Sequence, residues 1–80
     1  MEKWLKQLQK MPWHDQARVN AALLQLFARN FAALHRKQLR GYVNMFRIRV
    51  GNYRIIYRDD GNEITVISIP PKGDNTYNDL

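Results

Sequence analysis

Residues 45–58, MFRIRVGNYRIIYR, decide the fold because their apolar side chains recur with the period of two that is typical of β-strands. Phe46, Ile48 and Val50 alternate with Met45 and with basic residues. Gly51 and Asn52 follow at once and supply a two-residue loop of the kind found in type II′ and type I′ hairpins. This stretch therefore predicts an antiparallel hairpin with one apolar face and one basic face.

The length of the loop also predicts the register of the hairpin, in which Val50 lies opposite Tyr53 and Arg49 lies opposite Arg54. One face then carries six apolar or aromatic side chains: Phe46, Ile48, Val50, Tyr53, Ile55 and Tyr57. The other face, called the arginine face below, carries Met45, Arg47, Arg49, Arg54, Ile56 and Arg58. After a turn at residues 59–62 we expect a third strand over residues 63–69, in which Ile64, Val66 and Ser68 share the parity of Tyr57.

Two helices are predicted before the hairpin. Residues 2–11 repeat apolar side chains at helical spacing, and Pro12 stops that helix. Asp15 is the expected N-cap of a second helix over residues 15–30, and Asn30 could end it in a left-handed conformation. This helix has one apolar stripe: Val19, Ala22, Leu23, Leu26 and Phe27. The basic residues 35–42 then connect it to the first strand, with Gly41 as the turn.

These elements predict one α+β domain over residues 1–80, with two N-terminal helices packed on one face of a three-stranded antiparallel meander. The chain has no cysteine and two scattered histidines, so a disulfide framework or a zinc site is not expected. No apolar stretch is long enough for a membrane span, and the N-terminus lacks the apolar run of a secretory signal. We therefore expect a cytoplasmic protein without metal or cofactor.

Charge is distributed unevenly along the chain, whose net charge is +6. Between Asp15 and Asp59 there is no acidic residue, whereas the charged residues from Asp59 onward are mainly acidic. The basic middle comprises Arg18, Arg29, Arg36, Lys37, Arg40, Arg47, Arg49, Arg54 and Arg58. Such a distribution favours a polyanion or an acidic protein as partner, although a solvated, solubilising surface is the commoner meaning of a charge run.

The arginine face is costly in a small sheet, because like charges directly opposite each other repel. We expect Glu63 to pair with Arg58 across the second turn, whereas the strand pattern puts no acidic side chain beside Arg47 or Arg49. Clustered guanidinium groups suit phosphate oxygens, which they can bind bidentately. The alternative is that the long side chains simply extend into water. Lys72 leaves the third strand near Arg49 and Arg54, and Tyr77 can return to the same edge.

Residues 38–77, QLRGYVNMFRIRVGNYRIIYRDDGNEITVISIPPKGDNTY, resemble the RelE/ParE superfamily of bacterial type II toxin-antitoxin toxins. The shared pattern is leucine-basic-glycine, a basic-x-basic strand, glycine-x-tyrosine-arginine, an acidic turn, and basic-glycine-aspartate before a tyrosine. The resemblance implies the RelE-like microbial RNase fold, here lacking the strand that usually precedes the first helix. Two further departures are arginines where efficient nucleases tend to have lysine, and one extra residue before Tyr77.

What the resemblance implies about activity divides into three alternatives. RelE-like members cleave messenger RNA in the ribosomal A site, ParE-like members inhibit DNA gyrase without nuclease activity, and a truncated relative could be inactive and still bind its antitoxin. We favour the ribosome-dependent endoribonuclease. A cognate antitoxin is the implied partner in every case, and a homodimer could form through the sheet edge exposed by the absent strand.

Positions that match the RelE-like pattern supply the predicted site. Its catalytic residues are Arg47, Arg49, Arg54, Lys72 and Tyr77, and further RNA contacts are expected from Arg36, Lys37, Arg40 and Arg58. The implied reaction is a transesterification that gives a 2′,3′-cyclic phosphate, and it needs a base, an acid and positive charge around the phosphorane. Arginine cannot be the base, so Lys72 and Tyr77 are the candidates. We expect His14 and His35 to be structural or incidental.

Overall fold

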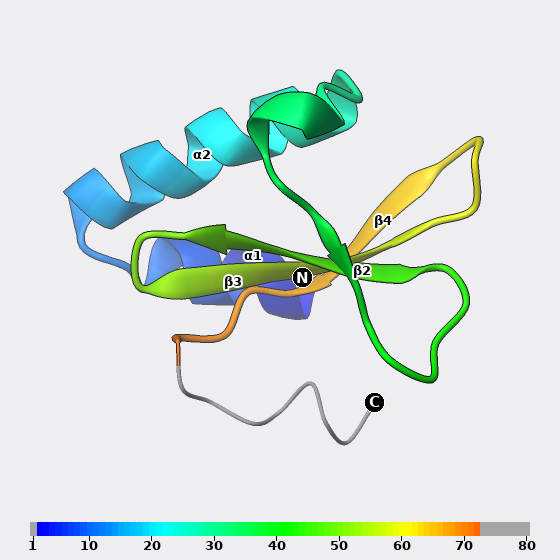
Figure 1. Cartoon of the computed structure of the whole chain (residues 1–80). Helices are drawn as coiled ribbons and strands as arrows, with labels where there is room; N and C mark the ends of the chain where they lie inside the picture. Colours follow the sequence, from blue (N-terminus) through cyan, green and yellow to red (C-terminus); the bar gives the residue numbers. More distant parts are fainter. Residues whose placement is uncertain (1, 73–80) are drawn as a thin grey trace.

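The computed structural model describes residues 2–72, in which two helices precede a four-stranded antiparallel sheet (Figure 1). The strands follow the order β1-β2-β3-β4 across the sheet. The elements are α1 (Lys3–Gln9), α2 (Trp13–Phe27), the 3-10 helix η1 (Phe31–Ala33), β1 (Lys37–Gln38), β2 (Met45–Val50), β3 (Tyr53–Asp59) and β4 (Ile64–Ser68). The α+β class and the helix-first order agree with the sequence prediction.

The β2–β3 hairpin has the predicted register. Val50 lies opposite Tyr53, Arg49 opposite Arg54, and Met45 opposite Arg58. Gly51 has a φ of 57°, the left-handed value that both predicted turn types require at the first loop position. The hairpin therefore separates an apolar face from the arginine face, as its period of two predicts.

The sheet differs from the predicted meander by one strand. β1 pairs with β2 through Lys37 opposite Arg47 and Gln38 opposite Phe46, and the Leu39 N–H donates to the Met45 carbonyl oxygen at 2.8 Å. The sequence predicted three strands, and β1 is the strand that it missed. A two-residue strand is too short to show a period. The pairing places Lys37 on the arginine face.

A bulge between Ile56 and Tyr57 changes the predicted parity of β4. Val66 lies opposite Tyr57, as expected, but the extra residue brings Ser68 opposite Ile56. Ser68 was predicted on the apolar face with Val66, and this prediction was wrong. Ile69 belongs to the main core instead.

Both helix boundaries of α2 differ from the prediction. Pro12 is the N-cap, and Asp15 lies in the first turn, where its charge suits the positive end of the helix. At the other end Arg29 has the left-handed φ of 60° that was expected of Asn30. The Arg29 N–H donates to the Leu26 carbonyl and the Asn30 N–H donates to the Gln25 carbonyl, both at 3.0 Å, which is a Schellman motif. This ending turns the Arg29 side chain toward β3.

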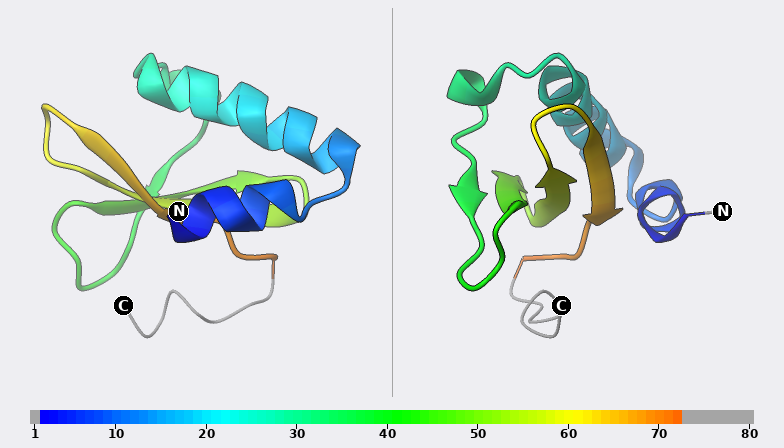
Figure 2. Two further views of the ribbon diagram at one scale, coloured as in Figure 1. Left: turned by 180° about the vertical axis from the view of Figure 1, so that it is seen from behind. Right: turned by 90° about the vertical axis from the view of Figure 1, so that its right-hand side faces the viewer.

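One apolar core lies between the helices and the sheet. Figure 2 shows α2 across one face of the sheet and α1 beside β4. Its buried members come from α2, β2, β3, β4 and the residues just before α2 and just after β4, and Trp4 and Leu8 of α1 pack against them. The cluster contains Met11, Val19, Ala22, Leu23, Leu26, Ile48, Ile55, Tyr57, Val66 and Ile69. Within residues 2–72, no helix has the length and apolar character needed to cross a membrane.

Candidate nucleic-acid interface

A basic pocket opens on the arginine face where β1, β2 and the end of the η1 connection meet. It has a volume of about 430 Å³ and is lined by Leu34, His35, Lys37, Arg47 and Arg49. Strand pairing explains the convergence, because Lys37 lies opposite Arg47, and Arg49 follows two residues along the same face of β2. We call this group of five residues the basic pocket.

Like charges are opposed twice on this face. Lys37 lies opposite Arg47, and Arg49 lies opposite Arg54 in the next strand pair. Two cations about 4 Å apart repel by about 1 kcal/mol in water and by more beside a low-dielectric surface. Ile56, opposite Arg47, is fully buried, so the face is not a uniformly solvated surface. The arrangement suits an anion that bridges several cations.

Arg54 and Lys72 lie toward the hairpin turn. The Arg54 backbone N–H donates to the Pro70 carbonyl oxygen at 3.0 Å, and the Lys72 N–H donates to the Asn52 carbonyl oxygen. Pro71 pairs with Tyr53 in an isolated antiparallel bridge, so the segment after β4 continues along β3 toward the hairpin turn. Tyr77, the last predicted catalytic residue, lies outside the described residues.

Arg36 points into a different environment from the one predicted for an RNA contact. Its Nη1 donates to Asp59 Oδ2 at 2.9 Å, and Arg29 donates to both carboxylate oxygens of Asp59 at 3.2 and 3.3 Å. The Asp59 side chain is only 6% exposed. The geometry gives Arg36 an intramolecular role, and RNA binding by Arg36 stays a prediction.

Aromatic rings complete the setting of Arg36. Its guanidinium carbon lies 3.8 Å from the ring centroid of Phe31 and 4.2 Å from that of Phe46. Phe46 in turn stacks on Tyr57, with ring centroids 5.6 Å apart. Burial raises the pKa of Tyr57, and this effect outweighs the opposing influence of Arg36. The network ties the connection after α2 to the end of β3 through Arg29, Arg36 and Asp59.

The carboxylate at the centre of this network keeps its negative charge. Burial alone would raise the pKa of Asp59, but hydrogen bonds from the Gly61 N–H, from Arg36 and from Arg29 outweigh it and lower that pKa. On sequence grounds Asp59 was predicted only as part of an acidic turn. Asp59 lies two residues after Tyr57 in the strand and therefore on the apolar face. A charge on that face needs a counter-ion, and this was the signal for a role in the core.

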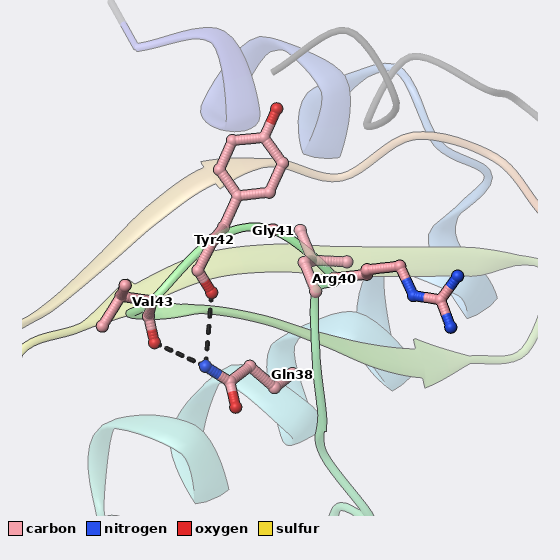
Figure 3. Close-up of a pocket in the computed structure, with 6 residues that line it drawn as sticks. Gln38, Arg40, Gly41, Tyr42 and Val43 are labelled. Carbon is pink, nitrogen blue, oxygen red and sulfur yellow. Dashed lines mark hydrogen bonds between the residues drawn. The ribbon is translucent and has the colours of Figure 1, made fainter.

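Two other predicted RNA contacts lie apart from the basic pocket. Arg40 lines a separate cavity of about 560 Å³ formed by residues 38–43. Figure 3 shows its side chain pointing away from Tyr42, while the Gln38 amide donates to the Tyr42 and Val43 carbonyl oxygens at 3.3 and 2.6 Å. This cavity carries one charged side chain, so it lacks the charge density of the basic pocket.

Arg58 is exposed on the arginine face, opposite Met45 and Thr65. We expected Arg58 to pair with Glu63, but the ion pairs of residues 2–72 do not include this one, so the prediction was wrong. Glu63 instead donates its backbone N–H to Asp60, in the turn before β4. Arg58 therefore stays available to a partner as an exposed cation.

His35 is the lining residue that sequence reasoning missed. Its backbone has a φ of 52°, and the residue is exposed at the end of the η1 connection, next to Leu34. Nothing in the spacing of residues 35–42 indicated a short strand that would bring His35 beside Arg47 and Arg49. Across residues 2–72 no group of three or more His, Cys, Asp or Glu side chains could hold a metal ion.

Comparison with known proteins gives one family. Residues 1–75 match the family model described as ParE toxin of type II toxin-antitoxin system, parDE. Neither the search of curated proteins nor the search of solved structures found a significant match. The family match covers both helices, the whole sheet and every residue of the basic pocket.

Proposed function

Since the chain belongs to the ParE toxin family of type II toxin-antitoxin systems, we propose that it is a ribosome-dependent endoribonuclease that inhibits translation. Membership of this family implies an antitoxin as partner. The finer claim concerns the target of the toxin, and two targets are in question, messenger RNA and DNA gyrase.

The observation that carries the proposal is the basic pocket. Lys37, Arg47 and Arg49 line one cavity without an acidic lining residue, and such a cavity suits the phosphodiester of an RNA strand. The strand register opposes Lys37 and Arg47 at a repulsive cost, which a bound anion relieves. Bound phosphate removes that repulsion.

Transesterification assigns different tasks to these groups. Arg47 and Arg49 would hold the nonbridging phosphate oxygens and stabilise the charge that develops as the 2′-oxygen attacks phosphorus. Arg54 lies opposite Arg49 and extends the same surface. The sequence prediction gives proton transfer to Lys72 and Tyr77, and we propose that Arg58 and Arg40 contact neighbouring phosphates.

Gyrase inhibition is the second candidate, because the description of the matching family names the ParE toxin. In that case the arginine face would bind a protein and no bond would be cut. A third candidate, an inactive relative that binds its antitoxin, predicts neither activity.

One experiment separates the three candidates. Purified protein is added to ribosomes translating a defined message, cleavage is mapped by toeprinting, and the same preparation is added to DNA gyrase in a supercoiling assay. The proposal predicts cleavage within the A-site codon and unchanged supercoiling. Inhibited supercoiling without cleavage would support the gyrase candidate, and the absence of both effects would support the inactive relative.

A further inference from the structure

His35 combines two features that are rare in one surface residue. Its φ of 52° lies in the left-handed region, which residues other than glycine seldom adopt. It also lines the basic pocket with Lys37, Arg47 and Arg49. This conformation ends η1, because the His35 N–H donates to the Phe31 carbonyl oxygen at 3.2 Å, as in the αL motif of helix ends. The placement of a histidine in a pocket with three cationic residues is the feature to explain.

Proton transfer is the task that the other lining residues perform least well. Arginine does not deprotonate in proteins, which excludes Arg47 and Arg49 as bases. Leu34 has no proton to exchange, and a lysine side chain in water is a protonated donor without an acceptor. Histidine is the side chain that most often exchanges protons between pH 5 and 8. In this pocket the histidine is also exposed, so a substrate can reach it.

We propose that His35 is the general base of RNA cleavage in the basic pocket, an inference that rests on the proposed nuclease function. The neutral imidazole takes the proton of the ribose 2′-hydroxyl while the 2′-oxygen forms its bond to phosphorus. The bond between phosphorus and the 5′-oxygen breaks, and that oxygen takes a proton from water. The products are a 2′,3′-cyclic phosphate and a 5′-hydroxyl, and the imidazolium returns its proton to solvent.

The placement of Lys72 supports this assignment. Lys72 follows the residues that pair with β3 and lies at the Gly51–Asn52 turn, and it is not among the described residues that line the basic pocket. His35 and Arg47 line the same cavity from adjacent segments. A nucleotide whose phosphate binds Arg47 would therefore place its ribose beside the cavity that His35 borders.

Backbone conformation offers a sharp test, because glycine and asparagine tolerate a φ of 52°. His35→Gly removes the imidazole and leaves space that free imidazole can enter. His35→Asn keeps a polar side chain in the same backbone conformation without a group that can act as base. His14→Asn is the matched control, since His14 lies exposed at the start of α2.

Single-turnover cleavage of a message on programmed ribosomes is measured for the unmodified protein and the three variants, with ribosome binding and circular dichroism recorded in parallel. Both His35 variants should cleave roughly 100-fold more slowly, the usual scale for losing a proton-transfer group, while binding changes by less than about threefold. Added imidazole should restore His35→Gly by at least tenfold and leave His35→Asn unchanged. His14→Asn should cleave like the unmodified protein.

Two results would overturn the role of His35 and leave the nuclease function standing: undiminished cleavage by His35→Gly and His35→Asn, or a loss in folded His35→Gly that imidazole does not restore. Absence of cleavage by the unmodified protein is a different result, because it removes the proposed function together with the role of His35.

Discussion

Replacement of Asp59 by asparagine should destabilise the domain more than any other single change at a charged residue of β3. The carboxylate accepts four hydrogen bonds, from Arg29 twice, from Arg36 and from the Gly61 N–H. Asparagine keeps one acceptor oxygen and turns an NH₂ group toward a guanidinium. The substitution leaves two arginines without their counter-ion.

The size of the effect follows from burial. Breaking a buried ion pair by removing one partner costs about 3–5 kcal/mol. The side chains of Arg29 and Arg36 are 36% and 29% exposed, so water recovers part of that cost, and we expect a loss of about 2–3 kcal/mol. Domains of this length have a total stability of about 4–12 kcal/mol, so the loss is a large part of the whole.

Urea denaturation followed by circular dichroism measures the change, and the midpoint should fall by about 1–2 M. Asp60→Asn is the matched control: Asp60 is exposed and, within residues 2–72, its side chain accepts only from the local Asn62 and Glu63 N–H groups, so the midpoint of this variant should stay close to that of the unmodified protein. Because folding lowers the pKa of Asp59, its contribution is complete above about pH 4 and is lost as pH falls through the folded-state pKa. Equal midpoints for the two variants would refute the reasoning.

Three further predictions test the fold and its partners. Gly51→Ala should lower the melting temperature, because alanine is strained at a φ of 57° and its Cβ would lie 3.1 Å from Arg18 Nη1; an unchanged melting temperature would contradict this. Lys37→Gln should raise the melting temperature at low salt by removing a cation opposite Arg47, and the gain should vanish in 1 M salt; a lower melting temperature at low salt would argue against repulsion. The β4 edge should accept a strand from the antitoxin or from a second copy, so amide exchange at Ile64–Ser68 should slow in the complex, and unchanged exchange would exclude this edge.

The hairpin could be predicted from sequence because its period of two and its Gly-Asn loop leave one register that buries the apolar face. β1 could not be predicted, since two residues carry no period. The end of α2 was misplaced because tertiary contacts decided it: Arg29 adopts the left-handed conformation and pairs with Asp59, thirty residues away. Local propensity alone favoured Asn30.

For the site, the alternation of side chains along a strand was enough to place Arg47 and Arg49 on one face. This alternation says nothing about side chains in the irregular backbone before β1. Arg36 precedes β1 by one residue, and it turns to the core side of the sheet because the buried carboxylate of Asp59 and the rings of Phe31 and Phe46 lie there. His35 itself has the left-handed conformation and lines the basic pocket, and side-chain patterns do not reveal such a conformation.

The most direct test of the phosphate-binding role is single-turnover cleavage of ribosome-bound message by Arg47→Gln, compared with Lys6→Gln. Both variants remove one positive charge, but Lys6 lies on α1, beside β4, whereas Arg47 lines the basic pocket. We predict that Arg47→Gln cleaves roughly 100-fold more slowly, the scale for losing one group that stabilises developing charge, and that Lys6→Gln cleaves at the unmodified rate. Equal rates for the two variants would contradict the assignment of the basic pocket as the site of RNA cleavage.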